Sequence, residues 1–548
     1  MSDLLRMTGM YSGMDTETIV SQLVKAKSTK VTNLKNEQKK LEWKQTAWQD
    51  LNSKIYNMYS KTLSNLRLTS AYSKKSTVSS DSTKATVVAS EGAVNGTQTL
   101  KVNKLAKSGY LTGAKLAGKT TTTTGTDGKD VTKVVNWETT DKLSEIDSNL
   151  TGKTISITTG SGTDAKTTDI EITADMTIND LVAKFKDAGV NASFDTTNQR
   201  FFINSTGTGS AKNFTLTSDD STALASLGLD PNTTYTDING SKNSCVKIEG
   251  QDAEIVLNGA TFVSDSNTFS INGLTINTLG VTDEEISLVT STDYDGIYNT
   301  IKDFLTEYND LINEMDKLYN ADSARKYDML TNDEKDSMTD DEVEQWEDKI
   351  KSALLRKDNS LYNVMNTLTT TMMDGYYENN LSDKQKKNMS ASEISAWYKE
   401  NGGKKHYLSD YGIGTLSYFE AQDNEHHAYH INGDADDEFT STKEDKLKAA
   451  IAEDPEGTAN FFATLCKTLY SKLDETMSES TEYSSIYKVY NDKQLKKDYK
   501  DYTKKISDAE DELNDYEDRW YNKFSKMEVA LSKLQSQTSS ISSMLGSN

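Results

Sequence analysis

Cysteine, proline and histidine are scarce in this chain of 548 residues, with two, two and four copies respectively. Cys245 and Cys466 lie far apart in the sequence and match neither a disulfide framework nor a metal-ligand spacing. No apolar run approaches the roughly 18–20 residues that a membrane-spanning helix needs. Residues 1–15 lack a charged segment followed by an apolar core, so the sequence predicts neither a conventional signal peptide nor membrane insertion.

Catalytic motifs are also missing. The sequence contains no P-loop, no GxSxG elbow and no HExxH pair. We therefore expect no catalytic residues and no enzymatic activity; a hydrolase that uses paired acids is the alternative, because Asp and Glu total 84. The formal net charge of −23 argues against nucleic acid as a partner, because phosphate contacts need a basic surface.

Histidines and aspartates near residue 430 have the residue types of metal ligands. His426 and His430 would share one face of a helix and could chelate a metal, but the loop-like context favours a polar surface turn. Asp434 and Asp436 begin a pattern like an EF-hand loop, in which Phe439 replaces the glycine that the sixth position requires. We therefore expect no metal and no cofactor.

Both ends of the chain carry apolar residues with heptad spacing. Near the N-terminus these residues stand seven apart, at Leu34, Leu41, Trp48 and Ile55. Near the C-terminus the steps alternate between three and four, with one extra step of four at Phe524, and the main members are Ile506, Leu513, Trp520, Phe524, Met527, Leu531, Leu534, Ile541 and Leu545. This spacing predicts coiled-coil helices with one stutter, whose apolar seams contact other helices in an assembly.

The first and last helices are expected to run antiparallel, with both termini at the same end of the molecule. We state one register as a hypothesis, in which Trp48 lies opposite Trp520. The same register aligns three further pairs of seam residues: Ile55 with Leu513, Leu41 with Met527, and Leu34 with Leu534.

The middle of the chain differs from its ends in composition and in residue pattern. Residues 76–292 are rich in Thr, Ser, Asn, Asp and Gly, and contain short β-prone runs between turn residues. One helix is predicted at 178–188, followed by two strands on either side of a turn at 195–199. A third heptad pattern begins at Ile297. The predicted fold class is multidomain α+β, with long terminal α-helices forming coiled-coil legs and β-rich outer domains inserted between them.

Changes in composition predict four domains. Three of them pair distant segments, because each inner part of the chain interrupts the part that surrounds it. The predicted domains are residues 1–40 with 515–548, terminal legs that are disordered until they assemble; 41–72 with 293–514, a helical coiled-coil domain with an acidic insertion at about 321–405; 73–110 with 240–292, an inner β-rich plate; and 111–239, an outer variable β-rich domain.

Several sequence blocks occur in an order that resembles one protein family. The first block includes Ser12, Gly13, Asp15, Ile19 and Leu23, in the pattern S-G-x-D-(T/S)-x-x-I-V-x-x-L. Later blocks lie at residues 41–48, 96–106, 253–259, 408–415 and 445–451. Together they resemble the flagellar hook-associated protein 2 family, whose members cap the flagellar filament. One departure is Asp265, where the family often has Arg.

The resemblance implies a structural role in flagellum assembly. It implies a homo-oligomeric ring, a pentamer, at the distal tip of the filament, where flagellin subunits fold and insert. The implied partners are flagellin, neighbouring hook-associated proteins and an export chaperone of the flagellar type III system. The implied location is extracellular, reached through type III export without a cleaved signal peptide.

Two other functions are alternatives to the filament cap. A hook–filament junction protein or filament protein would also have helices at both ends. A surface adhesin would bind host mucin or glycans through residues 111–239, whose Thr, Asn and Gly content allows such contacts. Adhesion does not exclude the cap.

Overall fold

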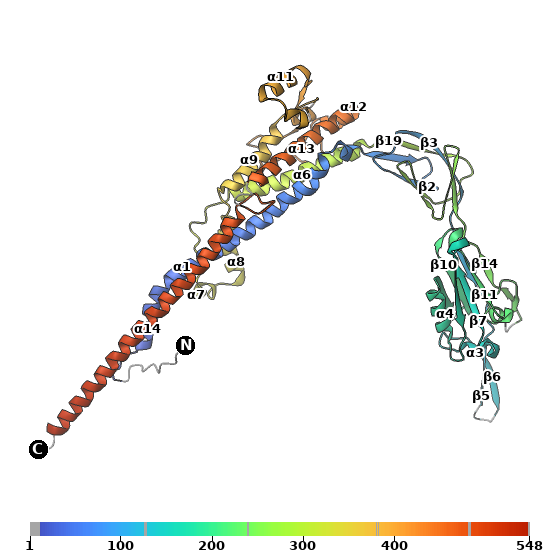
Figure 1. Cartoon of the computed structure of the whole chain (residues 1–548), viewed down its shortest axis with the longest axis horizontal. Helices are drawn as coiled ribbons and strands as arrows, with labels where there is room; N and C mark the ends of the chain where they lie inside the picture. Colours follow the sequence, from blue (N-terminus) through green and yellow to red (C-terminus); the bar gives the residue numbers. More distant parts are fainter. Residues whose placement is uncertain are drawn as a thin grey trace. The chain divides into compact units, whose positions relative to one another are not determined.

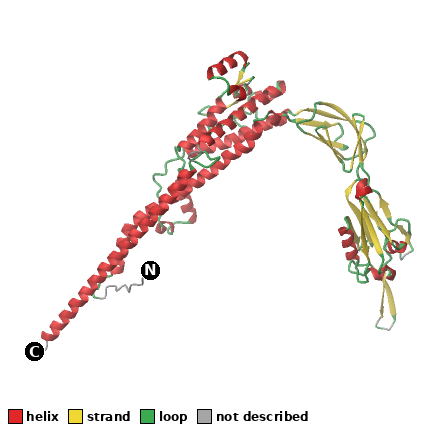
Figure 2. Ribbon diagram, in the orientation of Figure 1, coloured by secondary structure: helices red, strands yellow, loops and turns green. Residues whose placement is uncertain are grey.

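The computed structural model describes residues 11–124, 126, 129–237, 240–379, 381, 383–479 and 484–545. The chain divides into a helical unit, formed by residues 1–73 with 294–548, and a β unit, formed by residues 74–293. Figures 1 and 2 show long helices at both ends of the chain and strands in its middle. The predicted fold class, α+β with long terminal helices and a β-rich middle, is therefore confirmed.

The β unit contains a five-stranded antiparallel sheet in the order β1-β19-β3-β15-β16 and a three-stranded sheet in the order β17-β18-β2. Alternating residues of these strands point into a shared core that includes Leu100, Ile255 and Ile276. The strands are β1 (Lys75–Ser79), β2 (Ala85–Ala89), β3 (Gly96–Lys104), β15 (Ala253–Leu257), β16 (Ala260–Ser264), β17 (Thr268–Ile271), β18 (Leu274–Thr278) and β19 (Ile286–Thr292).

A second core in the β unit lies among residues 111–245. Its main sheet has the order β14-β4-β10-β9, and α4 (Ile178–Asp187) contacts β9. The predicted helix and the two predicted strands around residues 195–199 are confirmed. The elements here are β4 (Ser108–Thr112), β5 (Lys119–Thr124), β6 (Asp130–Val135), α3 (Leu143–Ile146), β7 (Thr154–Thr159), β8 (Lys166–Glu171), β9 (Val190–Asp195), β10 (Arg200–Thr208), β11 (Phe214–Ser218), α5 (Ser221–Ser226), β12 (Thr234–Thr236), β13 (Lys242–Ser244) and β14 (Val246–Ile248).

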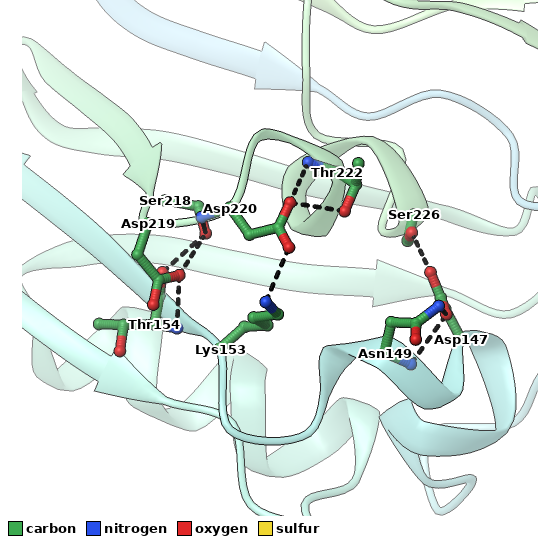
Figure 3. Close-up of polar contacts among 9 residues, drawn as sticks. All are labelled: Asp147, Asn149, Lys153, Thr154, Ser218, Asp219, Asp220, Thr222 and Ser226. Carbon is green, nitrogen blue, oxygen red and sulfur yellow. Dashed lines mark hydrogen bonds and ion pairs between the residues drawn. The ribbon is translucent and has the colours of Figure 1, made fainter.

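Aspartates form hydrogen bonds and an ion pair between neighbouring loops of this second core (Figure 3). Asp220 caps α5 by accepting from the Thr222 N–H at 2.9 Å, and its other oxygen pairs with Lys153 Nζ at 2.8 Å. Both contacts hold the pKa of the Asp220 carboxyl below its ordinary value, the lysine hydrogen bond most strongly. Asp147 accepts from Ser226 Oγ at the far end of α5, also at a lowered pKa. These acids are occupied by local contacts that hold loop and helix together.

The helical unit is built around one large core to which both of its sequence segments contribute. It includes Leu63 from the segment after α1, Phe304 from α6 and Leu469 from α13. The predicted heptad helix that begins at Ile297 is confirmed as α6. The helices are α1 (Thr16–Asn57), a π-helix (Met58–Leu63), α2 (Ser64–Leu66), α6 (Tyr294–Tyr319), α7 (Asn332–Lys335), α8 (Asp340–Ser352), α9 (Asn359–Met373), α10 (Asp383–Lys386), α11 (Ala391–Asn401), α12 (Lys446–Glu453), α13 (Pro455–Glu479) and α14 (Asp492–Leu545). Two small hairpins pair β20 (Tyr376–Tyr377) with β21 (Lys405–His406) and β22 (Ile413–Gly414) with β23 (His430–Ile431).

Candidate functional site: the paired terminal helices

Helices α1 and α14 lie side by side and antiparallel (Figure 1). Lys30 pairs with Glu512 at 2.8 Å, and Lys35 pairs with Glu510 at 2.7 Å. These ion pairs are exposed to solvent, which screens them, so they stabilise the helix pair only weakly. Burial of the apolar seam between the helices is therefore the main source of their association.

The structure places the predicted seam residues at graded depths. Trp48, Ile55 and Ile506 are buried, whereas Leu34 and Leu41 are half-buried. Along α14 the half-buried members are Leu513, Trp520, Phe524, Met527 and Leu531. Leu534 and Ile541 are exposed at 58% and 56%. Leu545 ends α14, and its side chain lies outside the described residues.

The hypothesised register of the two helices is wrong, although their antiparallel direction is confirmed. That register would place position 538 opposite Lys30, but the observed partner is Glu512, which is 26 residues nearer the start of α14. The difference is close to four heptads. A seven-residue repeat presents nearly the same apolar face after each shift of seven, so the spacing of the seam cannot select among these registers.

The register is set instead by a contact just before α14 begins. The Trp48 ring stacks on Tyr490 with centroids 4.9 Å apart. One turn further along α1, the buried Asn52 side chain donates to the Tyr487 carbonyl at 3.1 Å and accepts from the Val489 N–H at 3.0 Å. Trp48 and Asn52 thus hold residues 487–490 at one position along α1. Asn52 lies outside the heptad positions, so the heptad spacing did not identify it. The one signal for it in the sequence is a polar residue next to the apolar residue Leu51.

The family motif at the N-terminus forms the turn that starts α1. Asp15 caps the helix by accepting from the Thr18 N–H at 3.0 Å, and Gly13 has a positive φ of 68° that favours glycine. Leu23 is half-buried, whereas Ile19 is exposed because Val20 takes the inward position. The motif residues therefore build a helix start and do not form a single surface.

Ser12 joins this turn to the last helix. Its hydroxyl donates to Glu528 Oε1, and the Tyr11 N–H donates to Glu528 Oε2 at 2.8 Å. These hydrogen bonds, that of the Ser12 hydroxyl foremost, hold the pKa of the Glu528 carboxyl below its ordinary value. We did not expect Glu528 as a site residue from the sequence. Its position beside the seam residues Met527 and Leu531 was the available signal.

Past this contact, α14 continues without α1 beside it (Figure 1). The seam residues that α1 leaves uncovered are Leu534 and Ile541, the same two that are largely exposed. These two apolar side chains stand two turns apart on one side of the helix and are exposed to solvent.

The residues considered as metal ligands have other contacts. His426 stacks on Tyr418, and His430 Nδ1 lies 2.7 Å from Asp437. Lys302 Nζ pairs with Asp434 at 2.7 Å and with Asp436 at 2.6 Å, so a lysine neutralises these acids. Residues 425–429 are not helical, and His426 and His430 therefore do not share a helix face. Among the described residues no group of three or more His, Cys, Asp or Glu side chains is arranged to hold a metal.

This architecture defines a class: a multidomain α+β protein whose two long terminal helices pair antiparallel and whose middle is β-rich. Family models for the N-terminus and the C-terminus of flagellar hook-associated protein 2 match residues 12–109 and 250–536. The second match covers more than half of the chain, which therefore belongs to the flagellar hook-associated protein 2 family. Within the described residues, no helix is both long enough and apolar enough to cross a membrane.

Individual relatives extend the comparison. The chain is 24% identical to flagellar hook-associated protein 2 of Halalkalibacterium halodurans, over 98% of this chain and 99% of the relative. It is 28% identical to A-type flagellar hook-associated protein 2 of Pseudomonas aeruginosa, over 57% and 63%. Among solved structures, the D1–D2–D3 domains of the flagellar cap protein FliD from Escherichia coli match with 19% identity and a TM-score of 0.46, covering 80% of this chain and 97% of that one.

Proposed function

We propose that this protein is a filament cap, a homo-oligomeric ring at the distal tip of the flagellum. In this proposal the ring promotes the folding and insertion of flagellin subunits as the filament grows. Membership of the flagellar hook-associated protein 2 family supports the flagellar setting. The observation that carries the proposal is the uncovered end of α14, because it provides an apolar stripe for flagellin or for a neighbouring copy.

The predicted domains have separate roles in this proposal. Residues 1–40 with 515–548 act as legs that enter the filament, and residues 41–72 with 293–514 hold the legs together. Residues 73–110 with 240–292 form the plate of the ring, and residues 111–239 extend from it. The protein would reach the tip through the flagellar type III apparatus with an export chaperone, and would contact neighbouring hook-associated proteins there.

A pair of substitutions on α14 tests the role of the uncovered stripe. Leu534→Lys with Ile541→Lys should abolish filament elongation in cells that lack the native protein, so that flagellin appears as monomer in the medium. The matched control is Ser536→Lys with Ser540→Lys, which adds the same charge to the same stretch of helix. Normal filaments from the Leu534/Ile541 variant would refute the proposal. Fibres instead of rings in negative-stain images of the purified protein would favour a filament or junction protein.

Adhesion is a second candidate function, supported by the outer face of one sheet. Tyr110, Phe202, Val246 and Ile248 are exposed at 50%, 38%, 50% and 52%, and the strand register places them together on neighbouring strands β4, β10 and β14. Asn204 lies on the same face, directly opposite Tyr110. Aromatic rings beside amides suit the apolar and hydroxyl faces of a sugar. A glycan array with the intact chain tests this function, and Tyr110→Ala with Phe202→Ala should remove any signal that depends on the face.

A further inference from the structure

Two stretches of the helical unit repeat one sequence pattern at a constant offset of 51 residues. We name residues 332–350 module A and residues 383–401 module B. Identical residues occur at four offset pairs: Lys335 and Lys386, Met338 and Met389, Glu342 and Glu393, and Trp346 and Trp397. Conservative pairs lie between them, at Thr339 and Ser390, and at Val343 and Ile394. Such agreement over 19 residues indicates an internal duplication.

The two modules also share one local structure. Each has a short helix, a turn and a longer helix, namely α7 with α8 and α10 with α11. The longer helices begin with the same capping box, in which Glu342 accepts from the Thr339 N–H at 2.9 Å and Glu393 accepts from the Ser390 N–H at 2.7 Å. The partly buried residues fall at matching positions in both, and include the methionine and the tryptophan.

The charges of the modules are opposite. Module A has nine acidic residues and two lysines, for a net charge of −7, whereas module B has three acidic residues and four lysines, for a net charge of +1. The difference is concentrated at exposed positions. Three acids of module A correspond to lysines of module B, namely Asp333 to Lys384, Asp336 to Lys387, and Asp348 to Lys399. The same local structure therefore presents an acidic surface in module A and exposed lysines in module B.

The modules project from different sides of the helical unit (Figure 1). Module A lies against α1, where Asp333 pairs with Lys25 at 3.7 Å and Lys351, just after the module, lies over the Trp43 ring at 5.2 Å. Module B lies against the β20–β21 hairpin, where Tyr398 stacks on Tyr377 with centroids 4.7 Å apart. Complementary surfaces on different sides of one subunit are what a head-to-tail contact in a ring requires.

We infer that module B of one subunit binds module A of the next copy of this chain. Charge complementarity between the modules favours a second copy of this chain as the partner of module B, because each copy carries both module surfaces. The chain as a whole is strongly acidic, so a second copy offers acidic side chains to the lysines of module B. The inference rests on the proposed ring and specifies one contact within it. The lysines of module B would meet the acids of module A, and the contact would weaken as salt concentration rises.

Charge reversal in the full-length chain tests this contact. Lys384→Glu with Lys387→Glu and Lys399→Glu should weaken self-association in sedimentation velocity about tenfold at low salt, because three exposed ion pairs are lost. Adding Asp336→Lys, Asp340→Lys and Asp341→Lys should restore it. The matched control reverses three exposed lysines of the β unit, Lys133, Lys166 and Lys184, and should leave self-association unchanged.

Disulfide trapping gives a second measurement. A Lys387→Cys variant mixed with an Asp340→Cys variant should form a crosslinked heterodimer under oxidation, because both native cysteines are buried. An assembled protein that is insensitive to reversal of module B and forms no crosslink would overturn the inference and leave the filament cap standing. A wild-type chain that stays monomeric at every concentration would overturn both proposals.

Discussion

Replacing Asn52 with Ala tests whether the contact before α14 sets the register of the terminal helices. The substitution removes the side chain that accepts from the Val489 N–H and donates to the Tyr487 carbonyl, in a place where Asn52 is only 3% exposed. A buried polar group that loses its partner costs about 1–3 kcal/mol. Two such groups are affected, so we expect the free energy of unfolding of the helical unit to fall by about 2–6 kcal/mol.

Tryptophan fluorescence during urea unfolding measures this loss selectively. Of the six tryptophans, Trp137 lies in the β unit and the other five lie in the helical unit. With a denaturant slope of about 2 kcal/mol per molar urea, the midpoint of the helical unit should fall by about 1–3 M. Hydrogen exchange at backbone amides of the β unit should show that its stability is unchanged.

A matched variant separates this contact from polar contacts along the helix pair in general. Gln38→Ala removes hydrogen bonds from α1 to Thr503 and the Tyr499 carbonyl that are exposed to solvent, and it should shift the midpoint by less than about 0.5 M. If Asn52→Ala and Gln38→Ala have equal effects, the reasoning about residues 487–490 is refuted.

Three further predictions follow from individual side chains. Glu528→Gln should loosen the turn at Ser12, which faster hydrogen exchange at the Tyr11 amide would measure. In the native chain, the contribution of Glu528 to stability should be complete above its unfolded pKa of about 4.5. That contribution should decline as the pH falls toward the lowered pKa of the folded state. Asp220→Ala should lower the melting temperature of the β unit by about 2–4 °C, whereas Asp220→Asn, which retains a helix cap, should recover most of the loss in calorimetry. Burial raises the pKa of the Cys466 thiol to about 12 and that of Cys245 to about 11, so neither should react with a thiol reagent at pH 8 until urea unfolds the chain.

Periodicity in the sequence predicted which helices and strands form, because the spacing of apolar residues along the chain determines which side of an element is buried. The heptad positions of α1 and α6 lie on helices as expected, and residues 190–203 form the expected strand pair. The same periodicity failed for the register, since a repeat of seven is nearly unchanged by shifts of seven. The residue that settles the register, Asn52, acts through backbone groups more than 400 positions away.

The candidate site was predicted only in part, because apolar spacing identifies buried seam residues but not polar contacts between distant segments. Trp48 and Ile506 are buried as a seam predicts, whereas Ile19 points outward because 3.6 residues per turn bring Val20 inward at the start of α1. Glu528 could not be recognised from spacing, because its partners are the Ser12 hydroxyl and the backbone amides of residues 11 and 12, which lie outside the helices.

The helical unit has a consequence for the order in which the chain folds. Its core joins residues 48–72 to residues up to 490, so it cannot be completed until nearly the whole polypeptide is present. The β unit is one uninterrupted segment, and its pairings need no residue outside 74–293. A chain delivered from its N-terminus would therefore complete its middle before its ends. Closing a loop of that size adds only about 0.6 kcal/mol for each doubling of length, so a folded insert between the two helical segments is tolerated.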